Sequence, residues 1–253
     1  MTVYEYGTQN PKTLMLLHPS AVMWDYFEYV IPALKERYHL IIPALPGYDK
    51  KCPGTDFTSV EQVASELADW LIARGIRELD GLYGCAMGGS IVLRMTADGK
   101  VRIRHALMDG GITPYQLPWI ATRFIAVRDF LMIAMGKLGG VKLLEKVFKA
   151  DEMSKEDIAY AAGVLKFMSC RTIWRTFESC NNYRMPKEPS LHGARLRYWY
   201  GDKEAKERKW DLDYIRKNFP EAEFVMQADM GHAGMALNPD RFCEGITAYL
   251  EGE

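Results

Sequence analysis

The stretch Leu-Tyr-Gly-Cys-Ala-Met-Gly-Gly-Ser at residues 82–90 decides the fold. Its apolar first half is typical of a buried strand and its second half begins a helical pattern, so the glycines between them predict a tight strand-to-helix turn. Gly84 and Gly88 flank this turn, and their lack of a side chain lets the backbone bend sharply. Ala86 therefore stands at the apex of the turn.

The segments on both sides of this turn alternate between strand and helix patterns. Further strands are predicted at residues 3–6, 13–17, 39–43, 105–108, 195–200 and 223–227. Helices are predicted at residues 24–38, between Ser59 and Gly75, and at residues 90–97, 206–218 and from 239 onward. This alternation predicts right-handed crossover units, and hence an α/β fold with a mostly parallel sheet flanked by helices.

The alternation stops between residues 118 and 183. Every segment there is helical in period, at residues 120–135, 141–149, 155–168 and 171–180. We therefore predict an all-helical cap or lid inserted at 113–189, and a core made of residues 1–112 and 190–253. Apolar side chains that could line a pocket, or else form the ordinary core of the cap, are Trp24, Met132, Met135, Phe148, Phe167, Met168, Trp174, Phe177 and Tyr183.

Composition excludes several classes of protein. The chain has 253 residues, 48% of them hydrophobic, which is enough for one sizeable core. A formal charge of −1 gives no footprint for nucleic acid. Five scattered cysteines without a CxxC pair indicate neither a disulfide framework nor a metal site, and favour a reducing cytoplasm. The longest apolar stretch contains Arg128 and Asp129, so no membrane span is expected, and residues 1–12 lack the pattern of a secretory signal.

Residues 82–90 resemble the nucleophile elbow, G-x-S-x-G, of the α/β-hydrolase fold family, with Ala86 in the place of the serine. Residues 44–48, Ala-Leu-Pro-Gly-Tyr, resemble the D-x-P-G-x-G segment of the same family, with Ala44 in the place of the acid. The resemblance implies an α/β-hydrolase fold with a helical cap. It also implies a serine esterase or lipase-like activity that needs no metal or organic cofactor.

The family presents its catalytic residues in the chain order nucleophile, acid, histidine. The resemblance places Ala86 in the nucleophile position and His232 in the position of the base. His232 follows the last predicted strand in a Gly-His pair, from which a loop can lay the imidazole over the elbow.

Three carboxylates compete for the place of the acid. The family commonly has it three residues after a glycine at the end of the penultimate strand, and Glu204 stands at that spacing from Gly201. Asp202 follows the same glycine directly. Asp109, after the strand that follows the elbow helix, occupies the place that some relatives use. We take Glu204 as the first candidate.

Two backbone amides are expected to form the oxyanion hole. One belongs to Met87, at the amino end of the elbow helix, whose dipole favours negative charge. The other comes from the loop after the strand at 13–17. The family usually has His-Gly there, and His18-Pro19 departs from this; since proline has no N–H, Ser20 is the first candidate and Ala21 the second.

The neighbour of the missing serine, Cys85, invites the idea of a cysteine hydrolase. The turn exposes only its middle residue, however, and the residue before it points back into the sheet. Cys85 is therefore expected to be a small buried residue.

Two explanations of Ala86 remain open. In the first, alanine replaces the serine of an enzyme that hydrolyses a carboxylic ester with a mainly apolar or aromatic group through an acyl-enzyme, and this form binds substrate without turnover. In the second, the chain is a natural pseudoenzyme that binds a small apolar ligand. The same fold also supports carbon–carbon bond hydrolysis, lactone opening and acyl transfer. A monomer or homodimer is expected.

Overall fold

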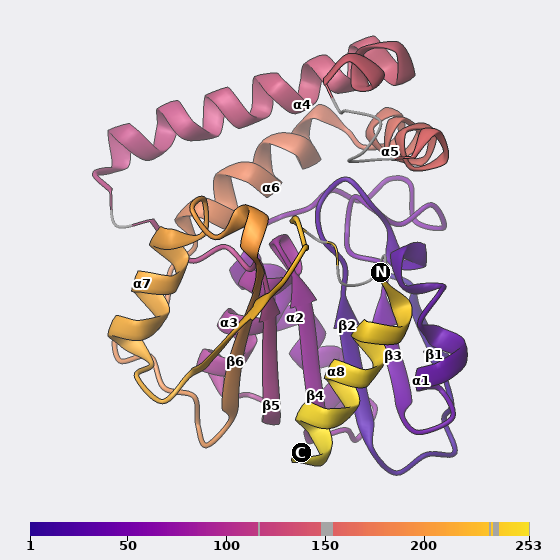
Figure 1. The fold of residues 1–253 in the computed structure, drawn as a ribbon, viewed down its shortest axis with the longest axis vertical. Coiled ribbons are helices and arrows are strands. Elements are labelled where there is room, and N and C mark those ends of the chain that lie inside the picture. The colour runs from indigo at the N-terminus through magenta and orange to yellow at the C-terminus, as the bar shows by residue number, and fades with distance from the viewer. Residues whose placement is uncertain (116, 148–153, 233, 235–237, 253) are drawn as a thin grey trace.

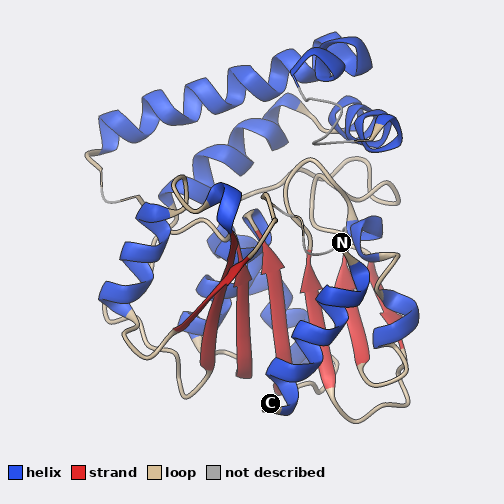
Figure 2. Cartoon of the chain, viewed as in Figure 1, coloured by secondary structure: helices blue, strands red, loops and turns tan. Residues whose placement is uncertain are grey.

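Seven strands of the chain form one sheet in the order β1-β3-β2-β4-β5-β6-β7 (Figures 1 and 2). This computed structural model describes residues 1–115, 117–147, 154–232, 234 and 238–252. The strands are β1 (Val3–Tyr6), β2 (Thr13–Leu17), β3 (His39–Pro43), β4 (Glu78–Cys85), β5 (Arg102–Asp109), β6 (Arg195–Gly201) and β7 (Glu223–Gln227). Only the pair β1–β3 is antiparallel among these neighbouring strands, so the predicted mostly parallel sheet is confirmed.

Helices cover both faces of this sheet. They are α2 (Val60–Ala73), α3 (Met87–Asp98) and α7 (Lys209–Asn218) on one face, and α1 (Ile31–Leu34) and α8 (Pro239–Glu251) on the other. Along β2, Met15 and Leu17 pack under the first group, whereas Leu14 and Leu16 pack under the second, and all four are buried. Burial on both faces explains why this strand is apolar throughout rather than alternating.

The prediction of a single helix over residues 24–38 is wrong. The structure has a 3-10 helix, η1 (Trp24–Phe27), followed by the four-residue α1. Pro32 is the second residue of α1. In a first helical turn the missing N–H of proline costs no hydrogen bond, so Pro32 begins a new helix instead of bending a long one.

Three helices between β5 and β6 cover the edge of the sheet at which its parallel strands end (Figure 1). They are α4 (Trp119–Val147), α5 (Lys155–Phe167) and α6 (Cys170–Asn182). The predicted helical insertion is therefore present, and the described residues between Trp119 and Asn182 are helical apart from short connections. The helices expected at 120–135 and 141–149 form one element, α4, with a non-helical residue at Gly140 (φ 55°), and residues 148 and 149 lie outside the described part. No described helix, α4 included, is both long and apolar enough to cross a bilayer.

Polar side chains of α6 hold the insertion on the core. The Thr172 hydroxyl accepts the N–H of Phe57 at 3.2 Å, and the Ser179 hydroxyl accepts the N–H of Val60 at 2.8 Å. Gly47 approaches so closely that a Cβ there would lie 2.4 Å from Oγ1 of Thr172. Buried backbone N–H groups need hydrogen-bond partners, and these two hydroxyls supply them. The bonds therefore hold α6 in one position on the core.

The junction between β4 and α3 is packed backbone against backbone. A Cβ at Gly84 would lie 2.3 Å from the backbone of Gly88, and a Cβ at Gly88 would lie 2.3 Å from the carbonyl oxygen of Leu17. No real Cβ approaches a backbone atom so closely, and backbone cannot move aside as a flexible side chain can. The contact of α3 with β2 and β4 therefore requires glycine at both positions.

Substituting Gly88→Ala tests this requirement. We expect the free energy of unfolding to fall by about 3 kcal/mol or more, because the added methyl group overpacks a junction made of backbone. Urea denaturation followed by circular dichroism measures the change.

A matched control is Gly163→Ala in α5, where a Cβ would meet nothing within 4 Å. There alanine is expected to raise the free energy of unfolding by about 0.5–1 kcal/mol, through its better helix propensity. A Gly88→Ala variant as stable as the parent would contradict the proposed packing constraint.

Candidate active site

Ala86 joins β4 to α3 in a conformation that few residues with a side chain adopt. Its φ is 48° and its ψ −110°, and its N–H donates to the carbonyl oxygen of Asp109 at 2.9 Å. Such a conformation costs on the order of 1–3 kcal/mol and persists only where the surroundings impose it. The side chain of residue 86 is thus held at the amino end of α3 by the glycine packing around it.

His232 and Glu204 meet close to this turn. The Nδ1 atom of His232 lies 2.7 Å from Oε2 of Glu204. A Cβ on Gly110 would lie 3.0 Å from both His232 Nδ1 and Glu204 Oε1, so both side chains pack against that glycine. Gly110 directly follows Asp109, whose carbonyl oxygen binds Ala86. The structure thus brings the positions 86, 204 and 232 to the same edge of the sheet.

Glu204 is the buried member of this pair, with 6% of its side chain exposed against 45% for His232. Its Oε1 accepts the N–H of Gly201 at 3.2 Å, and Nε of Arg208 lies 3.5 Å from its Oε2. Burial acts to raise the pKa of Glu204. The hydrogen bond and charge of His232 outweigh it, with help from Gly201 and Arg208, so the pKa lies below its ordinary value.

The ionised carboxylate of Glu204 determines which nitrogen of His232 carries the proton. A carboxylate can only accept hydrogen bonds, so Nδ1 of the ring is the donor. In the neutral imidazole, Nε2 then has a free lone pair and can accept a proton.

The two alternative acids have other partners. Asp202 accepts the N–H groups of Asp229 and Met230, at 3.1 and 3.2 Å, and so supports the loop that precedes His232. Asp109 accepts the hydroxyl of Tyr83 at 2.7 Å.

Cys85 lies fully buried at the end of β4, beneath the turn. Burial raises the pKa of its thiol well above the ordinary value, and the charge of Asp109 adds to the effect. The thiolate is the nucleophilic form of cysteine, so a buried neutral thiol is not suited to attack a substrate.

Met87 and Ser20 lie on two segments that meet beside Ala86. Met87 is the first residue of α3, where a backbone N–H has no partner within its helix. Ser20 lies in the turn after β2, and the end of β2 packs against Gly88. The amino end of α3 is a favourable place for negative charge, since unpaired N–H groups and the helix dipole act together there.

His18 holds the loop that contains Ser20. Its Nδ1 lies 2.8 Å from the carbonyl oxygen of Pro19, to which it donates, and its Nε2 accepts the N–H of Leu45 at 3.4 Å. Burial lowers the pKa of His18 to about 4, so the ring is neutral at pH 7. Both nitrogens are occupied, and His18 therefore has a structural role.

Six of the pocket candidates are buried or partly buried: Met168 and Tyr183 are buried, and Trp24, Phe167, Trp174 and Phe177 are partly buried. Trp24 stacks on Tyr4 at the sheet edge, with ring centroids 3.7 Å apart. In the cap, Trp174 meets Phe130 edge-on at 5.7 Å, and Phe167 is partly buried against the core. These contacts fit ordinary packing as well as they fit a pocket wall.

Two other pocket candidates face solvent. Met132 and Met135 on α4 are more than half exposed, which corrects the expectation that they line an apolar pocket or form the core of the cap. The residues of α4 that pack inward are instead Thr122, Ala126 and Phe130, because a helix turns about 100° per residue and presents these positions to α5 and α6. Phe148 lies outside the described residues.

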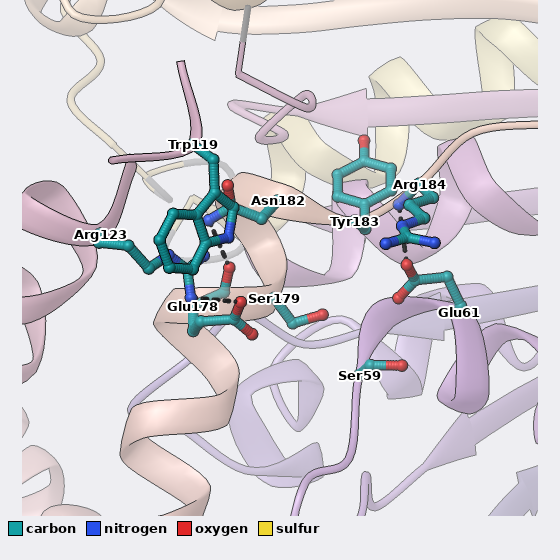
Figure 3. Close-up of a pocket in the computed structure, with 9 residues that line it drawn as sticks. All are labelled: Ser59, Glu61, Trp119, Arg123, Glu178, Ser179, Asn182, Tyr183 and Arg184. Carbon is teal, nitrogen blue, oxygen red and sulfur yellow. Dashed lines mark hydrogen bonds and ion pairs between the residues drawn. The ribbon is translucent and has the colours of Figure 1, made fainter. Parts of the chain in front are cut away.

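A separate cavity of about 470 Å³ lies between the beginnings of α2 and α4 and the end of α6 (Figure 3). Its lining residues are Ser59, Glu61, Trp119, Arg123, Glu178, Ser179, Asn182, Tyr183 and Arg184. Arg123 pairs with Glu178 at 2.8 Å, and Glu61 accepts the backbone N–H of Arg184 at 2.8 Å. None of the predicted catalytic positions lines this cavity.

Two residues of the site were not singled out from the sequence. Gly110 adopts φ +54° and leaves the space that His232 and Glu204 fill. Arg208 lies between Glu204 and Asp211, 3.2 Å from the second carboxylate. The Gly-Gly pair after β5 and the Glu204–Arg208 spacing of four residues were the signals that could have found them.

The arrangement suits proton transfer. An imidazole oriented by a buried carboxylate can act as a general base, and the amino end of α3 can stabilise a developing anion. Within the described ranges, no three His, Cys, Asp or Glu side chains are grouped so that they could hold a metal ion.

Comparisons with known proteins show the family of the chain and proteins of similar fold. The sequence matches the model of the alpha/beta hydrolase family over residues 14–244. It is 24% identical to Lipase 1 of Psychrobacter immobilis, over 98% of this chain and 80% of that protein. The fold is similar to MenH of S. aureus (TM-score 0.77, 16% identity, 99% of this chain and 97% of that one). It is also similar to a structure from work on carboxylesterases of Nitrososphaera gargenis (TM-score 0.76, 17% identity, 99% and 93%). The chain belongs to the alpha/beta hydrolase family.

Proposed function

We propose that this protein is built to hydrolyse a carboxylic ester, or a related acyl compound, with a mainly apolar group. The observation that carries the proposal is the 2.7 Å contact between His232 and Glu204, with both side chains packed on Gly110 beside the turn of Ala86. The lipase and carboxylesterase among the similar proteins support an ester as the substrate.

The proposed chemistry requires a serine hydroxyl at position 86. Nε2 of His232 takes the proton of that hydroxyl as its oxygen attacks the carbonyl carbon of the ester, and the N–H groups of Met87 and Ser20 stabilise the oxyanion. The protonated His232 then gives its proton to the oxygen of the leaving alcohol. The alcohol departs, and the acyl group stays bonded to the serine as the acyl-enzyme. Water, activated by the same base, releases the acid and regenerates the hydroxyl.

Ala86 removes the nucleophile but leaves the base, the acid and the amides in place. Loss of the serine in another serine hydrolase lowers turnover about a millionfold, which corresponds to about 8 kcal/mol of barrier. We therefore propose that this form binds substrate under the 113–189 cap without forming an acyl-enzyme.

The described cysteines are all free, which supports a reducing compartment such as the cytoplasm.

A second candidate function is a receptor for a small apolar ligand on the same fold. The alanine at position 86 favours it directly, since a receptor needs the capped site but not the hydroxyl. The strained backbone at Ala86 favours the enzyme instead, because a receptor has no need to display that side chain at such a cost.

The variant Ala86→Ser distinguishes the two functions. We expect a burst of alcohol from short aryl esters followed by steady turnover, on the order of 10⁵–10⁶ times faster than the Ala86 form. The control is Ala86→Ser with His232→Ala, in which the burst should disappear. A folded Ala86→Ser protein that is inactive on esters, thioesters, lactones, carbon–carbon substrates and acyl acceptors would support the receptor.

The acid is tested in the Ala86→Ser background. We expect Glu204→Gln to lower kcat about 10³–10⁴-fold. A neutral amide neither holds the imidazole in the required tautomer nor stabilises the imidazolium that forms when His232 takes the proton. Asp202→Asn and Asp109→Asn are the matched controls, and each should retain activity within about tenfold, since neither side chain bonds to His232. A larger loss in Asp109→Asn than in Glu204→Gln would move the role of the acid to β5.

The titration of Asp109 tests whether this carboxyl is buried beside Tyr83, as the structure has it. This test does not depend on activity. Burial raises the pKa of Asp109 from 3.8 to about 6; the Tyr83 hydrogen bond opposes this and the charge of Glu204 adds to it. A carboxyl whose pKa is raised by folding keeps its proton in the folded state between pH 4 and 6, while the unfolded state loses it. Stability from this group therefore falls as pH rises through that window.

We thus expect Asp109→Asn to be more stable than the parent at pH 7, by roughly 2–3 kcal/mol, with the difference vanishing near pH 4. Urea denaturation at pH 4, 5, 6 and 7 measures it. The asparagine oxygen can still accept the Tyr83 hydroxyl. An effect of the same size at every pH would mean that the substitution acts through packing and not through titration.

A further inference from the structure

The outer face of α4 is apolar along almost its whole length. Figure 1 shows α4 as the outermost helix of the insertion, with α6 between it and the sheet. Its exposed large apolar side chains are Trp119, Ile120, Phe124, Val127, Leu131, Met132, Met135, Leu138 and Val141. The exposed fractions of Phe124 and Leu138 reach 75% and 87%. Single exposed apolar side chains are ordinary, but a contiguous row of them marks an interaction surface.

The row follows the spacing of a coiled coil. From residue 120 to residue 138 one row of apolar positions on the outer side of α4 has intervals of four, three, four, three and four, and it ends just before the non-helical Gly140. We call this row the α4 seam; its residues are Ile120, Phe124, Val127, Leu131, Ala134 and Leu138. A seam with this repeat fits the matching seam of another helix. The exposed Trp119, Met132, Met135 and Val141 lie beside the seam and would flank such a contact.

The size of the surface is that of a stable interface. At roughly 100 Å² for each half-exposed large side chain, the nine exposed residues present on the order of 900 Å² of surface. The largest apolar patch on a typical monomer is about 300–600 Å², while a standard protein interface buries about 800 Å² on each partner. The α4 face is thus large enough for a dimer and too large for the surface of an ordinary monomer.

Charges beside the seam already have partners within the chain. Arg128 lies 2.7 Å from Asp129, and Arg123 lies 2.8 Å from Glu178. The ammonium of Lys137 donates to three backbone carbonyls at the end of α5. A second copy of this chain can therefore cover the seam without leaving these charges unpaired, and the net charge of −1 gives little repulsion between copies.

We propose that the α4 seam binds the α4 seam of a second copy, and that the two helices run antiparallel. Because the body of each copy lies on the inner side of its α4, two such helices can meet without a clash between the bodies (Figure 1). The symmetric arrangement centred near residue 129 places Phe124 against the partner's Ala134 and Val127 against the partner's Leu131. A parallel pair would put Phe124 on Phe124 and Ala134 on Ala134, which crowds one layer and leaves a void in another.

Mass in solution tests the dimer. We expect sedimentation and light scattering to give twice the mass of the 253-residue chain for the unmodified protein. Leu131→Glu and, separately, Leu138→Glu should weaken dimerisation at least about a hundredfold, because each puts a carboxylate in the middle of an apolar seam. Both side chains are exposed in the single chain, so the variants should keep their circular dichroism spectra. Their melting temperatures should fall toward that of a monomer, because association stabilises the folded state of the parent.

The matched control is Met226→Glu, at an apolar residue of β7 that is 57% exposed and lies outside α4. It should remain dimeric. A monomer at all concentrations, or Leu131→Glu and Leu138→Glu variants that stay dimeric, would overturn the proposal. So would a monomer that floats with phosphatidylglycerol vesicles and loses this binding in Leu131→Glu, since it would assign the surface to lipid.

Disulfide cross-linking tests the direction of the helices. Val127→Cys and Leu131→Cys, each made in a separate chain and then mixed under oxidising conditions, should cross-link to each other and not to themselves. The unmodified chain, with its own exposed Cys170, is the control for background cross-linking. Self-cross-linking by each variant, without mixed products, would overturn the antiparallel arrangement.

Discussion

The rest of the structure depends on the contact of Gly88 with the carbonyl oxygen of Leu17, where a single methyl group would find no room. This contact seats the amino end of α3 against β2 and forces the strand-to-helix turn into the strained conformation of Ala86. The strained conformation costs a few kcal/mol, and burial of the apolar cores on both faces of the sheet offsets this cost. Among the described residues, Ala21, His192 and Asp229 also have positive φ, but these three lie in turns, whereas Ala86 joins a strand directly to a helix.

A line of alternating charges joins this edge of the sheet to the start of the helical insertion. His232 contacts Glu204, Glu204 lies beside Arg208, and Arg208 pairs with Asp211. Asp211 in turn accepts the backbone N–H and the hydroxyl of Thr113, at 2.7 and 2.9 Å, where the chain leaves β5 for α4. Since a buried charge is costly without its partner, this line couples the position of the insertion to the orientation of the imidazole.

Periodic segments were predicted well from the sequence, because a strand buried on both faces and a capped amphipathic helix each leave a local pattern. Thr13–Leu17 and Glu223–Gln227 have the bounds expected of them. The prediction was wrong at Pro32, where the helical apolar pattern of residues 24–38 competes with a proline that begins a new helix. It was also wrong where the direction in which a side chain points, and not its apolar character, decides what it contacts. Met132 looked like a pocket residue because it is apolar, but its place on the turn of α4 points it to solvent.

The sequence by itself determined the fold class, the helical insertion and the small set of residues from which a site could be built, because glycine spacing and hydrophobic period are local properties of the chain. Only the tertiary structure decided which carboxylate meets His232, since Asp109, Asp202 and Glu204 all stand at strand ends and differ only in what lies across from them. It also decided that one face of α4 stays uncovered. Both depend on which segments, distant along the chain, come to lie side by side, and no local pattern encodes that.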